Sequence, residues 1–241
     1  MPVTKATIGR NLRRIREDIA LACGRVGRPP EDVRLVAVTK SVDLEAIKAL
    51  LDSGLTDLGE SRSQQFTQRV AEVDAYLRRR RNPLPSPVRW HMIGHLQRNK
   101  VKGVLGCAEM IHSVDSLRLA EAIDGRAERL GRVVDLLLQV NCSQEEQKFG
   151  VAVGAAVHLG ELICTLGHVR LNGLMTMAPI AEDPEKARPS FVRLRELFEE
   201  MRGEKIGGEH FRHLSMGMSQ DYVPAVEEGA TLLRIGTALF E

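Results

Sequence analysis

The chain has 241 residues, a length that suits one large α/β domain, because barrels of that class run to about 250 residues. Its 34 lysines and arginines against 32 aspartates and glutamates leave a net charge of +2, too small to favour a nucleic acid or an acidic membrane surface as partner. Aromatic residues are only 4%, so few rings can stack on bases, while 43% hydrophobic and 27% charged residues are typical of a folded globule and exclude disordered and fibrous classes.

Eight short runs rich in Val, Ile and Leu alternate with longer segments of helical period. This alternation is typical of a parallel sheet with crossover helices. The predicted strands cover residues 35–40, 55–59, 88–94, 110–114, 133–141, 169–175, 211–216 and 232–236. The predicted helices cover residues 4–22, 44–53, 61–81, 96–106, 116–130, 153–166, 184–202 and 222–228.

The residues at the ends of these helices support their boundaries. Glycine takes the left-handed conformation that follows many helices, and four glycines stand at such positions: Gly54, Gly131, Gly167 and Gly229. Aspartate is a good N-cap, and we expect this role for Asp43, Asp115 and Asp183.

Eight strands alternating with helices favour a closed (β/α)8 TIM barrel over an open doubly wound sheet, whose edge strands are usually more polar. We predict a single domain over residues 1–241, with an N-terminal helical extension over residues 1–30 that lies outside or beneath the barrel.

The cysteines and the N-terminal segment indicate the cellular setting. Cys23, Cys107, Cys142 and Cys164 form no CxxC pair, which argues against a zinc site or a disulfide framework and predicts reduced core thiols. The first residues lack the apolar region of a signal peptide, and no run approaches the ~18 apolar residues of a membrane span. We expect a cytoplasmic protein that binds neither nucleic acid nor a membrane.

The first predicted strand ends at a lysine, Lys40. Reactive groups of a barrel project from the carboxyl ends of its strands. A lysine held against an apolar wall loses solvation of its charge, so its amine becomes available to attack an aldehyde and form a Schiff base. The alternative is a solvated lysine that merely ends a strand.

The loops after the seventh and eighth strands are where barrels commonly bind phosphate. Small residues there let backbone N–H groups approach an anion, and hydroxyls add further donors. The candidates are Ser215, Ser219, Gly236 and Thr237. The alternative is that these residues only form turns.

Arg234 shares one face of the last strand with Leu232 and Gly236, so it points either into the barrel or into the helix layer. Its partner is a carboxylate or, alternatively, an aromatic ring nitrogen of a bound cofactor. A lysine, a phosphate seat and an inward arginine together match the aldehyde carbon, the phosphate and the pyridine nitrogen of pyridoxal 5'-phosphate (PLP).

Eight motifs make the chain recognisable: LVAVTK at 35–40, GES at 59–61, WHMIGHLQRNK at 90–100, IHSVD at 111–115, VN at 140–141 with KFG at 148–150, GLMTM at 173–177, SMGMS at 215–219 and RIGTA at 234–238. In order and spacing they resemble the YggS/PROSC family of pyridoxal phosphate homeostasis proteins, from the first strand to the C-terminus. The resemblance implies a barrel like the N-terminal domain of alanine racemase. It also implies PLP bound as a Schiff base to Lys40, phosphate contacts from Ser215, Ser219, Gly236 and Thr237, and a ring-nitrogen contact from Arg234.

The chain departs from the family pattern at two positions. Ser61 stands where many members have asparagine, and Gln220 replaces a common acidic residue, so any contact made by those family residues is in doubt here. The roles of Glu60 and His91 are left open.

Other candidate site residues are weaker. Lys148 is the further lysine best placed to hold a second aldehyde. His91 and His95 are four residues apart but lie on no common helix face, so we expect no metal site.

An arginine at the pyridine nitrogen tends to keep that nitrogen unprotonated and weakens the ring as an electron sink. Related racemases add a tyrosine from a C-terminal β-domain, a domain that we do not expect here, and the two tyrosines of this chain, Tyr76 and Tyr222, follow no predicted strand directly. We therefore expect a monomeric PLP-binding protein of vitamin B6 homeostasis that serves apo-PLP enzymes and lacks robust catalysis. The alternatives are a fold-type III PLP racemase or decarboxylase, and a barrel isomerase or lyase for a phosphorylated sugar.

Overall fold

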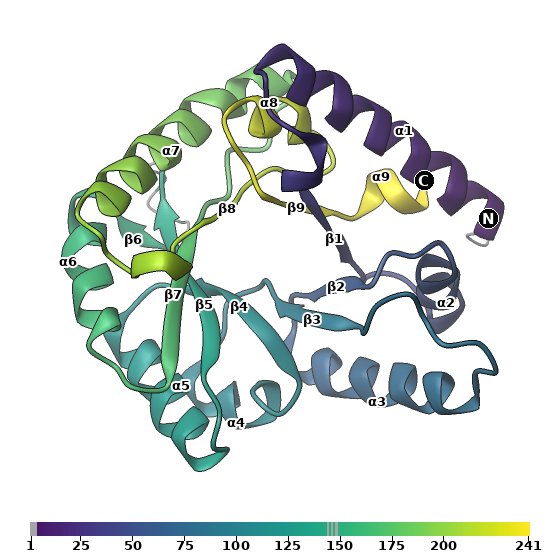
Figure 1. Ribbon diagram of the computed structural model, residues 1–241, viewed down its shortest axis with the longest axis horizontal. Helices are drawn as coiled ribbons and strands as arrows, with labels where there is room; N and C mark the ends of the chain where they lie inside the picture. The colour runs from purple at the N-terminus through teal and green to yellow at the C-terminus, as the bar shows by residue number, and fades with distance from the viewer. Residues whose placement is uncertain (1–3, 144, 146, 148) are drawn as a thin grey trace.

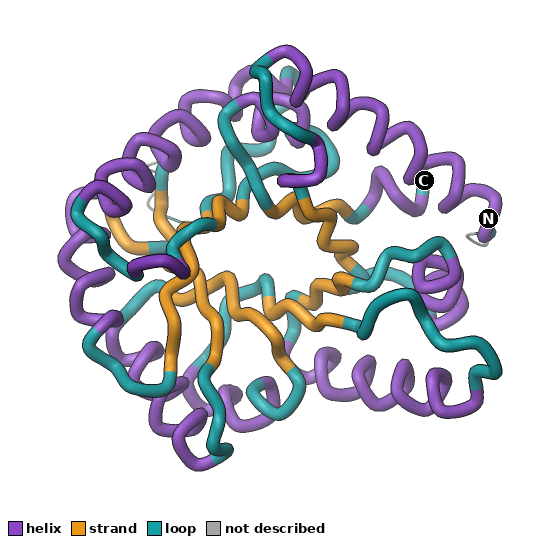
Figure 2. The backbone as a smooth tube through the Cα atoms, in the orientation of Figure 1, coloured by secondary structure: helices purple, strands orange, loops and turns teal. Residues whose placement is uncertain are grey.

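The chain folds into a closed barrel of eight parallel strands, seen end-on in Figure 1 and as an orange ring in Figure 2. The computed structural model describes residues 4–143, 145, 147 and 149–241. Each barrel strand pairs with its neighbours in chain order, and pairing of β4 with β5 and of β1 with β9 completes the ring. The strands are β1 (Arg34–Val38), β2 (Asp57–Glu60), β3 (Arg89–Met92), β4 (Ala108–Val114), β5 (Val134–Asn141), β7 (Val169–Met175), β8 (His213–Ser215) and β9 (Leu232–Ile235).

Helices surround the ring of strands (Figure 1). The α-helices are α1 (Lys5–Arg25), α2 (Leu44–Asp52), α3 (Ser63–Arg79), α4 (Val101–Val104), α5 (Leu117–Arg129), α6 (Val153–Cys164), α7 (Arg188–Gly203), α8 (Tyr222–Glu227) and α9 (Thr237–Phe240). Short 3-10 turns cover Pro30–Asp32, Arg98–Lys100, Pro184–Ala187 and Gly208–His210. The predicted (β/α)8 barrel is confirmed.

The N-terminal helix lies on the outside of the barrel. Its residues Ile8, Leu12 and Ile15 recur at helical spacing and are buried, because α1 packs on α8 and α9. The Tyr222 hydroxyl of α8 donates to Asp18 of α1 at 2.5 Å, so this tyrosine serves helix packing.

Some local predictions were wrong. The sequence pattern missed the two-residue strand β6 (Val151–Ala152) and the last helix α9. Asp43 and Asp183 accept capping hydrogen bonds as expected, but Ser116 rather than Asp115 precedes α5, and Gly167 lacks the left-handed conformation that the other three helix-ending glycines adopt.

The cysteine prediction was half right. All four cysteines are free, and Cys23 and Cys142 are buried. Cys107 and Cys164 are exposed, so they are not core thiols.

The barrel interior holds both apolar and polar side chains. Strands β1, β4, β5, β7 and β9 contribute one buried apolar cluster: Val36, Met110, Leu137, Met175 and Leu232. The other interior positions hold buried polar side chains: Asp57, His91, His112, Ser215 and Arg234. A much larger apolar cluster fills the space between the strands and the helices. These polar side chains lead to the site described next, because one of them, Arg234, lines its cavity.

Gly173 lies at an irregularity in the barrel wall. Along β5 and β7 the register moves from Leu136 opposite Leu171 to Leu137 opposite Gly173, so Asn172 is an extra residue. Gly173 has φ +148°, and a Cβ there would lie 1.9 Å from the His213 carbonyl oxygen of β8. Only glycine fits this close approach.

We predict that Gly173→Ala lowers the free energy of unfolding by about 3 kcal/mol, because it combines an unfavourable φ with a backbone clash. Chemical denaturation measures the change. The control is Gly125→Ala in α5, where a Cβ meets nothing within 4 Å, and this change should stabilise the protein by about 0.5–1 kcal/mol. Equal stabilities for the two variants would contradict the prediction.

Candidate cofactor-binding site

A cavity of about 310 Å³ lies at the carboxyl ends of the barrel strands. This is the end of the barrel where ligands bind in folds of this kind. Its apolar walls include Val38, Ile93 and Met177, and its polar lining includes Lys40, Ser219, Asp221, Arg234, Gly236 and Thr237. Five of the six predicted site residues therefore line one cavity.

Lys40 lies two residues beyond the end of β1 and lines the cavity. Its side chain is exposed to solvent, which differs from the enclosed apolar setting predicted for it. The ammonium forms no ion pair with any residue that the structure describes. The amine is thus accessible to a ligand in the cavity.

The loops after β8 and β9 are joined by Ser219. Its Oγ accepts hydrogen bonds from the backbone N–H groups of Gly236 at 3.1 Å and Ala238 at 3.2 Å. Gly217 has φ +91°, and a Cβ there would lie 2.6 Å from the Ala225 Cβ, so the loop bends tightly against α8. Backbone N–H groups and hydroxyls thus gather at one side of the cavity, as an anion seat requires.

Arg234 points into the barrel and its guanidinium forms the base of the cavity. Its Nη1 donates to the Ser215 Oγ at 2.6 Å and its Nη2 to the Thr176 carbonyl oxygen at 2.8 Å. Burial lowers the pKa of this guanidinium to about 10, against the nearby Asp221 carboxylate, so it stays charged at neutral pH. Among the described residues it has no salt-bridge partner, which argues against the ion-pair alternative.

Ser215, the sixth predicted site residue, is not among the residues that line the cavity. It is fully buried at the last position of β8. Its Oγ is engaged by Arg234 at 2.6 Å and by the His112 Nδ1 at 2.9 Å. The hydroxyl serves the arginine.

Further buried polar side chains extend the contacts of Ser215 across the interior. The His112 Nε2 lies 3.0 Å from the His91 Nδ1, and the His91 Nε2 lies 3.0 Å from the Asp57 Oδ1. Asp57 also receives two hydrogen bonds from Arg89, at 2.8 and 2.7 Å. His91 is therefore a packed interior residue and not a cavity residue, and it is directed away from His95.

Burial and contacts shift the pKa of two of these groups in opposite senses. Burial raises the pKa of Asp57, but hydrogen bonds from His91 and Arg89 outweigh it and lower the pKa to about 2. Burial, with the nearby His91 and Arg234, holds the pKa of His112 well below its usual value, so this imidazole is neutral.

Two residues that the sequence left open are now placed. Glu60 is fully buried beside the Thr39 hydroxyl, which donates to its Oε1 at 2.7 Å, and burial raises its pKa. Glu60 does not line the cavity, whereas the departures from the family pattern, Ser61 and Gln220, both do. Lys148 lies outside the described residues.

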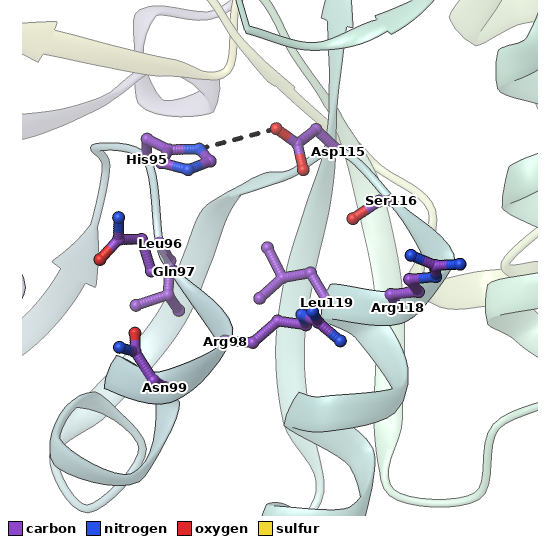
Figure 3. A pocket seen from close by; sticks show the side chains of 9 residues that line it. All are labelled: His95, Leu96, Gln97, Arg98, Asn99, Asp115, Ser116, Arg118 and Leu119. Atoms are coloured by element: carbon purple, nitrogen blue, oxygen red, sulfur yellow. Dashed lines mark ion pairs between the residues drawn. The ribbon is translucent and has the colours of Figure 1, made fainter.

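A second, more open cavity of about 660 Å³ adjoins the first and shares His95 with it. Figure 3 shows His95 turned toward Asp115, at 3.7 Å, with Arg98 and Arg118 on the side of α5. His95 also stacks on Phe149 at a centroid distance of 4.1 Å. Its contact with His95 is the reason that Asp115 does not cap α5.

Several residues of the site were not predicted from the sequence. The prediction of the strands used their apolar runs and not the polar residues within them. The residues missed in this way are Asp57, His112 and Gln139. Period-two alternation was the available signal, since a polar residue inside a buried parallel strand needs a partner. Tyr76 is remote from the cavity, on α3 near Asp52.

The fold and the cavity define a barrel of the alanine racemase N-terminal domain class, and the family model "Alanine racemase, N-terminal domain" matches residues 10–241. The chain belongs to this family and, within it, to the pyridoxal phosphate homeostasis proteins. It is 40% identical over 229 residues to the protein of that name from Aquifex aeolicus (strain VF5), which covers 95% of each chain. It is 32% identical to the one from Escherichia coli (strain K12), which covers 97% of this chain and 95% of the relative.

Solved structures agree. The chain matches a protein of unknown function from Bifidobacterium adolescentis with a TM-score of 0.90 and 35% identity, over 100% of this chain and 98% of the other. It matches PipY of Synechococcus elongatus PCC7942, solved with PLP bound, with a TM-score of 0.80 and 30% identity, over 97% and 100% of the two chains. Alanine racemase of Clostridium difficile 630, at 14% identity and a TM-score of 0.74, shares the fold over 57% of its length.

In the part of the chain that is described, no helix is long and apolar enough to cross a membrane. Within the same residues, no group of three or more His, Cys, Asp or Glu side chains is arranged to hold a metal ion.

We predict that Asp57→Asn reduces the loss of stability at acid pH. A carboxylate with a lowered folded pKa contributes stability above its unfolded pKa, and this contribution is lost as pH falls from about 4 toward 2. Between pH 6 and pH 3 the wild type should lose about 1 kcal/mol more than the variant. Urea denaturation at both pH values measures this difference, and equal losses would refute the assignment.

Proposed function

We propose that the protein binds pyridoxal 5'-phosphate reversibly through Lys40 and takes part in intracellular vitamin B6 homeostasis. The observation that carries the proposal is the gathering of Lys40, Arg234 and the loops of Ser219 and Gly236 around one cavity. Relatives over nearly the whole chain carry the homeostasis name, and PipY was solved with PLP. The bound group supplies an aldehyde carbon, an anionic phosphate and a pyridine nitrogen.

The residues of the cavity fit these features one by one. The Lys40 Nζ attacks the aldehyde carbon, a C=N bond forms, and the carbonyl oxygen leaves as water. The reverse reaction with water, or transfer to another amine, restores the lysine. The hydroxyls of Ser219 and Thr237 would hold the phosphate beside the loop of Gly236, whose N–H groups at Gly236 and Ala238 donate to the Ser219 Oγ.

Arg234 holds the pyridine nitrogen. Neither of its two protein contacts uses Nε, so this N–H is available toward the cavity. Because a guanidinium does not readily give up a proton, the ring nitrogen accepts a hydrogen bond and stays unprotonated. This weakens the stabilisation of a carbanion at a bound amino acid.

The geometry favours binding over catalysis. Racemisation needs an acid and a base on opposite faces of the reacting carbon. No tyrosine of the described chain lines the cavity, since Tyr222 is bonded to Asp18 and Tyr76 lies on α3. The exposed position of Lys40 suits exchange of the bound cofactor with the solvent. We propose a monomeric cytoplasmic protein that gives up the cofactor to apo-PLP enzymes.

We predict that borohydride reduction of the PLP-loaded protein fixes the cofactor on Lys40, because this lysine lines the cavity. Peptide mapping identifies the modified residue, and the visible absorption band of lysine-bound PLP reports loading. Lys40→Ala should abolish the band. Lys48→Ala, which removes a lysine paired with Glu45 on α2, should leave it unchanged. Sustained amino-acid turnover that Lys40→Ala abolishes would instead support the racemase or decarboxylase alternative.

We predict that Thr237→Val weakens binding of PLP about tenfold, because a hydroxyl that donates to phosphate is lost while the shape is kept. Binding of pyridoxal, which has no phosphate, should change less than twofold. Titration of the absorption band gives both affinities. An equal loss for the two ligands would place the phosphate elsewhere.

A further inference from the structure

Five buried side chains form one continuous chain of hydrogen bonds through the barrel interior. It runs from Arg234 to Ser215 at 2.6 Å, to His112 at 2.9 Å, to His91 at 3.0 Å and to Asp57 at 3.0 Å. The five belong to β9, β8, β4, β3 and β2, and none is more than 4% exposed. This hydrogen-bond chain begins with Arg234 at the base of the cavity. It ends at Asp57, the first residue of β2, toward the amino ends of the strands.

The two ends set the direction of the terminal bonds, and with two neutral imidazoles a single arrangement satisfies both ends. A guanidinium can only donate, so the Ser215 Oγ accepts from Arg234 and its O–H donates to the His112 Nδ1. A carboxylate can only accept, so the His91 Nε2–H donates to Asp57. Between them, the His112 Nε2–H donates to the His91 Nδ1. In this arrangement each imidazole carries its proton on Nε2.

The charged and titratable groups near the hydrogen-bond chain agree with this direction of its bonds. Asp57 is held ionised by the Arg89 guanidinium, with Arg34 at 4.0 Å. His213, on β8 and within the electrostatic reach of His112, has its pKa lowered by burial to about 4, so it adds no charge to the interior. The positive end faces the cavity and the negative end faces the opposite end of the barrel.

The polar chain has a cost that an apolar interior would avoid. Replacing buried charged and polar networks with apolar side chains is often neutral or stabilising. The same barrel shows that alternative, because Val36, Met110 and Leu137 fill other interior positions. The network is therefore explained by what it does for Arg234, the member that reaches the cavity.

We propose that Asp57, His91, His112 and Ser215 are positioning residues for Arg234, which orient its guanidinium and couple its contact in the cavity to the carboxylate at the far end of the barrel. The inference rests on the proposed function for the identity of the group that Arg234 meets. Ser215 fixes Nη1, the Thr176 carbonyl fixes Nη2, and Nε is left toward the ligand.

Two measurements test the proposal. The first is ¹⁵N NMR of the histidine side chains in the ligand-free protein, with His91→Gln and His112→Gln variants to assign the signals. We expect both residues to be neutral Nε2–H tautomers from pH 8 to pH 6. A proton on Nδ1 of either residue, or a charged imidazole in this range, would overturn the inference whether or not the protein binds PLP.

The second measurement is PLP affinity in two matched variants. Asp57→Asn removes the charge at the end of the chain, and it should shift the ¹⁵N signals of His112, which it does not touch, and weaken PLP binding about fivefold. Asp135→Asn is the control. Asp135 lies near the amino end of β5, and its Oδ1 is 2.7 Å from Nε and 2.6 Å from Nη2 of Arg170. This pair is not part of the hydrogen-bond chain. Equal effects of the two variants would refute the coupling.

Ser215→Ala keeps the proposal testable if Asp57→Asn fails to fold. It removes the group that contacts Arg234 directly, so it should weaken PLP binding at least tenfold. An unchanged affinity would refute the positioning role. A wild-type protein that forms no adduct on Lys40 would refute the proposed function, while the tautomers of the ligand-free protein would still decide the direction of the chain.

Discussion

Arg234 brings a positive charge to the base of the cavity inside a closed barrel, where its side chain is almost fully buried. Burying a charge without compensation costs several kcal/mol, and no carboxylate in the described structure contacts this guanidinium. A series of hydrogen bonds through the interior instead connects the guanidinium to the ionised carboxylate of Asp57. The composition of the barrel interior agrees with this, since β3, β4 and β8 supply histidines and a serine at interior positions beside a separate apolar cluster.

The fold could be predicted because its signal is local and repeated. Each strand of a parallel barrel is buried on both faces, so it appears in the sequence as a short apolar run, and the crossover helices carry their own period. Arg234 could be selected because period two places it on one face with Leu232, but this left open whether that face is the barrel interior or the helix layer. The five cavity residues were selected from the ends of strands, from the period of the last strand and from the resemblance to a family.

The remainder depends on contacts between residues distant in sequence. Ser215 and His112 are 103 positions apart, and their meeting requires the closed ring and two register shifts beside β4. A serine in a glycine-containing segment gives the same sequence signal whether it faces the loop or the interior, so the sequence could not show its contacts with Arg234 and His112. Asp115 has the composition of an N-cap, yet its carboxylate faces His95, and tertiary contact overrode the local preference.

The arginine and the lysine that line the cavity differ in how firmly their side chains are held, and this difference bears on function. The guanidinium is held by two hydrogen bonds in a packed interior, whereas the Lys40 amine lies exposed beyond the end of β1. In the proposed function, a cofactor held at its ring nitrogen and phosphate would remain oriented when its bond to the lysine breaks, so water or an incoming amine would reach its aldehyde carbon from the solvent side. An enzyme must instead exclude water around that carbon and enclose it between an acid and a base. In the proposed function, the exposed lysine and the hydrogen-bonded arginine would therefore favour holding and releasing the cofactor over chemistry on a bound amino acid.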